Sequence, residues 1–199
     1  MEKLPGEPSV PHIGRIWSLF LNHHARIILD VGCGYGWFGK YRPPHVEVVG
    51  VDSDEAKLRI AVKYERVVKA DVCCLPFKNS CFDGVLASHI LEHVPNDLKA
   101  MREINRVLRR GGVLIAEAPT PWHGAKADST HLRSYDLKSF RDLAEKAGFK
   151  VRSLCVLGRG IPGFGKLKLY SASYHIGNFL SQHLHVFRGF VFMVCQKPI

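Results

Sequence analysis

The sequence lacks several features that define large classes of proteins. No apolar run approaches the length that spans a membrane, and no N-terminal stretch resembles a signal peptide, so we expect a cytoplasmic protein. The six cysteines form no C-x-x-C pair and no zinc-binding spacing. We therefore expect free or buried thiols in a reducing compartment, and we predict no metal site.

Acidic residues are absent from the last part of the chain. Residues 146–199 carry eight Lys or Arg and no Asp or Glu, whereas residues 1–145 carry 20 basic and 18 acidic residues. Such a basic region favours an anionic partner, such as RNA, a phosphorylated metabolite or an acidic lipid surface. A solvated basic face that only serves solubility stays open as the alternative.

The chain has the size and composition of one globular domain. It has 199 residues, 46% hydrophobic and 23% charged, and we treat residues 1–199 as a single domain. Predicted strands alternate with predicted helices, which favours a parallel sheet with helices on both faces. We therefore predict an α/β fold with a Rossmann-like, doubly wound, mostly parallel seven-stranded sheet and an antiparallel last strand. The strands are expected at residues 27–31, 46–51, 66–69, 82–89, 113–118, 150–157 and 190–195.

Several predicted helices end at residues that stop helices. Pro43 and Pro44 should shorten the helix that follows the first strand. Gly111 should stop a helix that runs to Leu108, and Gly148 should stop the next helix along the chain. The helices are therefore expected to be compact connections between strands.

Two segments lie outside this alternation. Residues 1–25 contain a proline-rich arm and a short amphipathic helix, which we expect to cover one edge of a cofactor cleft. Residues 158–189 are punctuated by glycine at both ends and look helical over residues 166–183. Their aromatic and basic side chains are compatible with binding to RNA or to an anionic membrane, but the glycines at both ends, which permit hinge motion, favour a lid or substrate-specificity element.

The stretch from Ile28 to Gly36, Ile-Leu-Asp-Val-Gly-Cys-Gly-Tyr-Gly, is the centre of the pattern. An apolar strand runs into clustered glycines, which let the backbone turn tightly and approach a ligand. A second apolar run ends at Asp52, whose carboxylate can accept hydrogen bonds from both hydroxyls of a ribose. These features predict a site for an adenosine-containing cofactor.

Two cofactors fit this opening. Gly34, Gly36 and Gly39 satisfy G-x-G-x-x-G, which is typical of a nicotinamide dinucleotide site. In the register that starts two residues earlier, however, the third glycine position holds the bulky Trp37. Asp30 at the end of the strand would also repel a pyrophosphate, whereas it would balance a cofactor that carries an ammonium and a sulfonium.

Three segments together resemble the class I S-adenosylmethionine-dependent methyltransferases, most closely the methyltransferase type 11 group. They are Leu-Asp-Val-Gly-Cys-Gly-Tyr-Gly at 29–36, Leu-Pro-Phe at 75–77 with Phe-Asp at 82–83 and Leu-Glu-His-Val at 91–94, and the segment at 103–112 that ends in Gly-Gly. The resemblance covers about residues 27–149. It implies the cofactor S-adenosylmethionine and transfer of its methyl group to a small molecule or a nucleic acid.

The resemblance also implies roles for individual residues. Asp30 and the glycine loop would hold the methionine end, Asp52 the ribose, and Asp71 with the Val72 N–H the adenine. The full set of implied cofactor residues is Asp30, Gly32, Cys33, Gly34, Gly36, Asp52, Ser53, Asp71, Val72, Ser88 and His89.

An acceptor nitrogen or oxygen that must lose a proton can require a general base, and histidine suits this task near neutral pH. In the family pattern a histidine like His131 borders the acceptor pocket, so His131 is the first candidate and Tyr135 a positioning group. His89 is a second candidate base, and His93 and His123 are further histidines in the same region. A nicotinamide-dependent oxidoreductase and a non-catalytic basic module that binds RNA or membrane stay open as alternatives.

Overall fold

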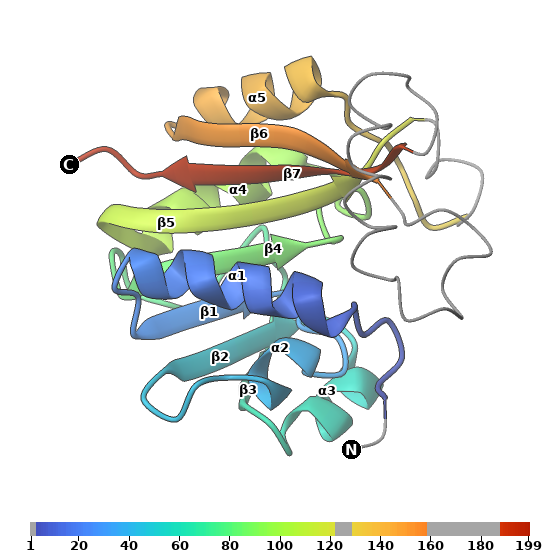
Figure 1. Ribbon diagram of the computed structural model, residues 1–199, viewed down its shortest axis with the longest axis vertical. Coiled ribbons are helices and arrows are strands. Elements are labelled where there is room, and N and C mark those ends of the chain that lie inside the picture. The colour runs from blue at the N-terminus through green and yellow to red at the C-terminus, as the bar shows by residue number, and fades with distance from the viewer. Residues whose placement is uncertain (1–2, 122–128, 159–187) are drawn as a thin grey trace.

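The computed structural model describes residues 3–121, 129–158 and 188–199 (Figure 1). Three predicted features lie outside the described residues: the helix at 166–183, nearly all of the lid at 158–189, and His123. The described helices are α1 (Val10–Asn22), α2 (Trp37–Lys40), α3 (Glu55–Ala61), α4 (Asp97–Val107) and α5 (Leu137–Lys146). The described strands are β1 (Ile27–Val31), β2 (Glu47–Asp52), β3 (Arg66–Lys69), β4 (Phe82–Ser88), β5 (Leu108–Pro119), β6 (Lys150–Gly158) and β7 (Arg188–Gln196).

The strands form one sheet in the order β3-β2-β1-β4-β5-β7-β6. Strands β1 to β5 pair in parallel, whereas β7 lies antiparallel between β5 and β6. This confirms the predicted seven-stranded Rossmann-like sheet. The strand order reverses between β1 and β4, and open sheets of this kind bind ligands beyond the carboxyl ends of the strands at that point.

Helices cover both faces of the sheet. Successive strand residues point to opposite faces, so neighbouring residues of one strand pack against different helices. Ile28 packs with α1 and α2 on one face, and the next residue, Leu29, packs with α4 and α5 on the other. Figure 1 shows α1 lying across the middle of the sheet and α5 beside β6. On the α1 face, Trp17 stacks on Phe38 with ring centroids 4.1 Å apart. These two apolar layers fix the strand ends that carry the site.

Local side-chain chemistry sets several helix boundaries. Asp54 caps α3 and Asn96 caps α4 through their side chains, and Asp136 forms a capping box with Ser139 at α5. Gly148 follows α5 with a φ of 87°, as expected of a left-handed stop.

The boundary between α4 and β5 differs from the prediction. The helix ends at Val107, and Leu108 already has extended backbone and pairs with Phe82 of β4. Leu108 is fully buried, so pairing within the sheet overrides the helical pattern there. Gly111 does adopt a positive φ, 76°, but as an irregularity within β5, where its N–H donates to the Lys197 carbonyl.

Among the described residues, no helix combines the length and the apolar character needed to cross a bilayer.

Candidate functional site

A pocket of about 300 Å³ lies at the carboxyl ends of β1 and β2 and just beyond β3. It brings together five of the predicted cofactor residues, which come from three separate segments of the sequence. They are Gly32, Asp52, Ser53, Asp71 and Val72. The remaining wall comes mainly from the loop after β4, including Ile90 and His93.

The glycine loop after β1 is fixed by the neighbouring strand. Gly32 and Cys33 donate their N–H groups to the Val51 carbonyl at 2.7 and 3.0 Å. Gly32 has a φ of 74°, and a Cβ there would lie 2.9 Å from the Ile90 side chain. The loop therefore needs glycine at this position both for its backbone conformation and for its close contact with the pocket wall.

Asp52 ties the glycine loop to the start of α3. One carboxylate oxygen accepts the Gly34 N–H at 3.0 Å, and the other accepts the Asp54 N–H at 2.9 Å. A carboxylate offers about four acceptor positions, so two remain for the hydroxyls of a ribose. Asp71 similarly accepts the Cys73 N–H at 2.8 Å through one oxygen, which orients its carboxylate at the pocket.

Asp30 does not line this pocket, in contrast to the expectation that three carboxylates share one groove. It is 2% exposed, and its Oδ2 accepts no hydrogen bond among the described residues. Burial, reinforced by the charges of Glu65 and Asp52, holds the pKa of Asp30 well above its usual range. Asp30 therefore lies next to Asp52 but beneath the surface of the pocket.

Glu65 is a second buried acid that sequence reasoning missed. A Cβ on Gly39 or Gly50 would collide with its carboxylate, so the two glycines leave the space that this side chain fills. Gly39, the last glycine of the dinucleotide-like spacing, thus serves packing. Burial raises the pKa of Glu65 to about 7, and it likewise raises the pKa of the neighbouring Cys33 thiol. In the sequence this acid is indicated only by Gly39 and Gly50, and that both of them face Glu65 becomes visible only in the fold.

At the end of β4, Ser88 joins a buried network that the sequence did not predict. Its hydroxyl donates to Glu117 Oε2 at 2.6 Å, and His12 Nε2 of α1 lies 2.7 Å from Glu117 Oε1. Burial pushes the pKa of Glu117 up, but His12, His89 and Ser88 together outweigh burial and lower it. His89 follows with a φ of 52°, a conformation that is rare outside glycine, and its N–H donates to the Glu117 carbonyl. The network anchors the predicted N-terminal helix at the strand end that carries Ser88 and His89.

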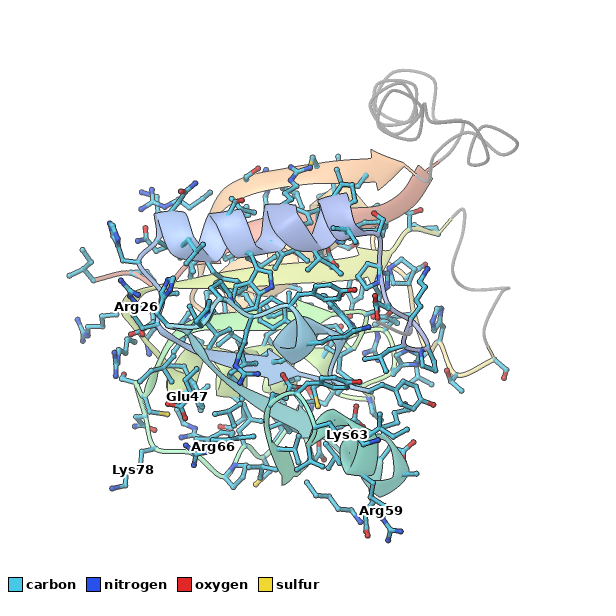
Figure 2. The ribbon with its side chains drawn as sticks, turned by 60° about the horizontal axis from the view of Figure 1, so that its bottom comes forward. Arg26, Glu47, Arg59, Lys63, Arg66 and Lys78 are labelled. Carbon is cyan, nitrogen blue, oxygen red and sulfur yellow. The ribbon has the colours of Figure 1, made fainter. Side chains whose placement is uncertain are left out.

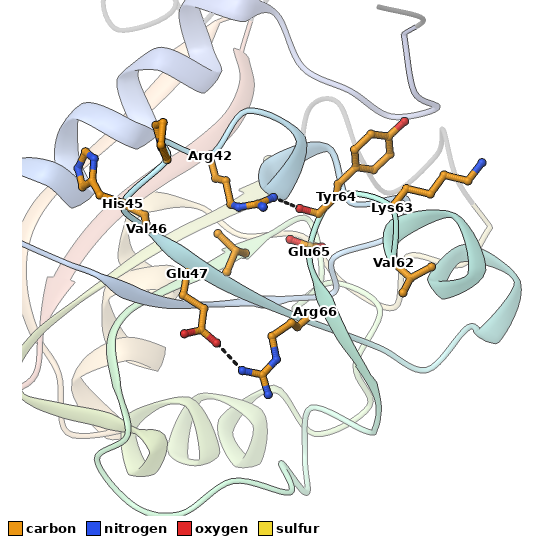
Figure 3. Close-up of a pocket in the computed structure, with 11 residues that line it drawn as sticks. Arg42, His45, Val46, Glu47, Val62, Lys63, Tyr64, Glu65 and Arg66 are labelled. Carbon is orange, nitrogen blue, oxygen red and sulfur yellow. Dashed lines mark hydrogen bonds and ion pairs between the residues drawn. The ribbon is translucent and has the colours of Figure 1, made fainter.

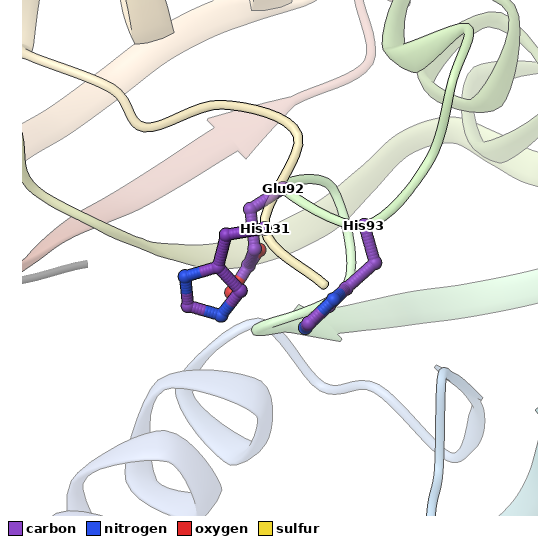
Figure 4. A group of neighbouring side chains, drawn as sticks. All are labelled: Glu92, His93 and His131. Carbon is purple, nitrogen blue, oxygen red and sulfur yellow. The ribbon is translucent and has the colours of Figure 1, made fainter. Parts of the chain in front are cut away.

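The first candidate base, His131, lies beside the loop after β4. Its ring packs edge-on against His93 with centroids 4.7 Å apart, and Glu92 lies beside both (Figure 4). Tyr135 is 3% exposed, and its hydroxyl donates to Asp97 Oδ2 at 2.8 Å. Burial and this carboxylate raise the pKa of Tyr135. The placement gives Tyr135 an anchoring role, and its predicted role toward an acceptor stays a prediction.

A larger pocket, about 650 Å³, lies at the opposite end of the strands (Figure 3). Its wall includes an ion pair of 2.6 Å between Glu47 and Arg66, and the Arg42 guanidinium donates to the Tyr64 carbonyl. Figure 2 shows Glu47 and Arg66 on the same side of the molecule as Arg26, which precedes β1. None of the predicted cofactor residues belongs to this pocket.

The sheet order and the glycine loop are those of a Rossmann-like domain, and the acids at the end of β2 and just beyond β3 line its pocket. Residues 29–116 match the family model described as a methyltransferase domain. A probable S-adenosylmethionine-dependent methyltransferase of Mycolicibacterium smegmatis is 27% identical over 168 residues, which cover 74% of this chain and 65% of that protein. An uncharacterized protein of Methanocaldococcus jannaschii is 40% identical over 103 residues, 52% of this chain and 45% of that protein.

Among solved structures, a SAM-dependent methyltransferase from Archaeoglobus fulgidus superimposes with a TM-score of 0.69 at 19% identity, covering 93% of this chain and 94% of that one. The chain spans about half to two thirds of the length of the curated relatives named above. In its match over residues 29–116 and in these relatives the chain is similar to S-adenosylmethionine-dependent methyltransferases, and it shares the fold of the solved structure.

Proposed function

We propose that this chain binds S-adenosylmethionine in the 300 Å³ pocket and transfers its methyl group to an acceptor nitrogen or oxygen. The observation that supports this most is the convergence of Asp52 and Asp71 on one pocket from the ends of neighbouring strands. Asp52 keeps acceptor positions for two ribose hydroxyls, and Asp71 keeps one oxygen for the adenine amino group. The Val72 N–H is the proposed donor to an adenine ring nitrogen.

The methionine end of the cofactor would lie over the glycine loop, with Asp30 beneath it. Buried carboxylates are unfavourable without a positive partner, and none of the described residues supplies one that accounts for the burial of Asp30. The cofactor ammonium would supply that charge. Gly32, Cys33, Gly34 and Gly36 are the proposed backbone contacts, since three of these four have positive φ and no bulky side chain.

The sulfonium is an activated methyl donor, so the chain mainly has to hold an acceptor lone pair in line with the S–CH₃ bond, at about 3 to 3.5 Å. Ser88 and His89 at the end of β4 are the proposed residues beside the sulfonium. His131 is the proposed base for the acceptor proton, with His89 as the second candidate. Both histidines lie beside Glu92, which belongs to the loop after β4.

The acceptor is a small molecule or a nucleic acid. The only argument for an anionic partner is the excess of Lys and Arg at 146–199. Two of the described Lys and Arg residues in that stretch already contact other parts of the chain. Lys197 Nζ donates to the Asn105 and Leu108 carbonyls at 2.7 Å, and Arg152 contacts Gln196. These contacts indicate that some of the Lys and Arg residues in this stretch stabilise the fold.

Calorimetry of the full chain with S-adenosylhomocysteine and, separately, with NAD and NADP tests the proposal. We expect S-adenosylhomocysteine to bind with a stoichiometry of one and the dinucleotides not to bind. Binding of a dinucleotide alone would instead support an oxidoreductase. Binding of S-adenosylhomocysteine without transfer from labelled S-adenosylmethionine to any acceptor in a panel of RNA, quinones and amines would support a non-catalytic module.

A further inference from the structure

Glu92, His93 and His131 each place one ligand atom so that all three atoms lie within 4.8 Å of one another (Figure 4). Glu92 is fully buried, and neither of its carboxylate oxygens accepts a hydrogen bond among the described residues. Its Oε1 lies 3.3 Å from His89 Nδ1. A buried carboxylate is strongly unfavourable without a cation beside it, and either a protonated His89 or a bound metal ion supplies one here.

The chain is built to bring these three side chains together. Glu92 and His93 follow β4, and His131 comes from a segment almost 40 residues later. The Leu132 N–H donates to the Glu92 carbonyl at 2.9 Å. The Arg133 guanidinium donates to the Val94 carbonyl and, at 2.9 Å, to the Pro95 carbonyl. Four backbone groups are thus used to hold His131 against Glu92.

His93 is oriented as metal-binding histidines are. Its Nδ1 lies 3.3 Å from the Thr130 carbonyl oxygen and 3.0 Å from the Thr130 hydroxyl. The carbonyl only accepts, whereas the hydroxyl can donate or accept; in the tautomer with the proton on Nδ1 the ring donates to the carbonyl and Nε2 keeps its lone pair. A ligating histidine usually donates its other ring N–H to a carbonyl or carboxylate in this way.

We propose that Glu92, His93 and His131 bind one divalent first-row transition metal ion, with Zn²⁺ as the representative ion. Two imidazole nitrogens and one carboxylate oxygen form a donor set that suits such ions better than Mg²⁺ or Ca²⁺. Tetrahedral bonds to zinc bring ligand atoms to about 3.3 Å from one another, so binding draws ligand atoms that lie within 4.8 Å closer by at most about 1.5 Å. This inference goes beyond methyl transfer and does not depend on it.

The ion would lie at the edge of the cofactor pocket, because His93 also lines that pocket. A three-ligand site leaves a fourth position for water or for an oxygen of a bound molecule. His89 then contacts the ligating carboxylate, as a second layer around the ion. His131 would in that case act as a ligand, and the ion would lower the pKa of an acceptor hydroxyl that replaces the water.

Metal titration of the chelator-stripped full chain tests this proposal without measuring activity. We expect one equivalent of Co²⁺ or Zn²⁺ to bind and Mg²⁺ not to bind. The Co²⁺ complex should show ligand-field absorption without a thiolate charge-transfer band, which separates this site from the cysteines. Glu92→Gln, His93→Ala and His131→Ala should each weaken Co²⁺ binding more than about tenfold. His45→Ala, which removes an exposed histidine elsewhere, should leave binding unchanged.

Circular dichroism and S-adenosylhomocysteine calorimetry of the same variants establish whether they fold. A second measurement needs no variant: one equivalent of Co²⁺ should shift or broaden the amide signals of Glu92, His93 and His131 in the native chain. The proposal is overturned if the native chain binds no Co²⁺ or Zn²⁺. It is equally overturned if folded variants bind the ion as tightly as the native chain, or if the affected amides lie around the cysteines.

Discussion

The buried acid Glu65 makes a quantitative prediction about how stability depends on pH. The side chain is 7% exposed, and burial raises its pKa from 4.5 to about 7. In the unfolded chain the group ionises near pH 4.5, whereas the folded chain keeps its proton until about pH 7. The contribution of Glu65 to stability is therefore fully present below pH 4.5, falls as the pH rises through this window, and levels off above it.

The size of the effect follows from the shift. A displacement of about 2.5 pKa units corresponds to about 3 kcal/mol of unfolding free energy that is lost between the two pH limits. Glu65→Gln cannot ionise, so its stability should decline less over the same range. The buried amide carries its own hydrogen-bonding cost at every pH, and for this reason the slope, not the absolute stability, is the informative quantity.

Urea unfolding at half-unit steps from pH 4.5 to 8 measures both slopes. We expect the stability difference between Glu65→Gln and the native chain to shift by about 2 to 3 kcal/mol in favour of the variant across this range. Glu145→Gln, a change of the same chemistry at an exposed position of α5, is the matched control and should show no such shift. Parallel profiles for Glu65→Gln and the native chain would refute the assignment of a buried protonated acid.

Three further changes test the site and its supports. Asp52→Ala removes the proposed acceptor of two ribose hydroxyls, so calorimetry should show S-adenosylhomocysteine binding weakened by about 1 to 3 kcal/mol. An unchanged dissociation constant would refute the assignment of Asp52 to the ribose. Gly36→Ala should destabilise the fold by about 1 to 3 kcal/mol in urea, because φ is 80° and the new Cβ would lie 2.9 Å from the Ala61 backbone. Tyr135→Phe should lower the unfolding free energy by about 1 to 3 kcal/mol, since it leaves Asp97 without its hydroxyl donor. Native-like stability of either variant would contradict the packing described here.

Features that depend on neighbouring residues could be predicted from the sequence. The caps at Asp54 and Asp136 follow from side chains that bond to backbone two or three residues away. The strand at 66–69 and the acid two residues after it were likewise visible, because β-branched residues and turn signals are local. The resemblance in segment order then indicated which of these acids belong to one pocket.

Features that depend on contacts across the fold could not be predicted. His12 and Glu117 form a buried pair, but over 100 residues separate them and neither pattern alone indicates the other. The same holds for Glu65 beneath the glycine loop. The burial of Asp30 beneath the pocket could not be predicted either, since its position at the end of a strand does not show which atoms cover it. Leu108 was predicted in the helix but lies in β5, because it pairs with Phe82, which lies in another segment.

The central claim is that one adenosyl cofactor lies across the ends of β1, β2 and β3. A crystal structure of the full chain with S-adenosylhomocysteine tests this most directly. We predict both ribose hydroxyls within hydrogen-bond distance of the Asp52 carboxylate and the adenine amino group at Asp71. Ligand density in the pocket between Glu47 and Arg66, or an adenosyl group that touches neither acid, would contradict the account.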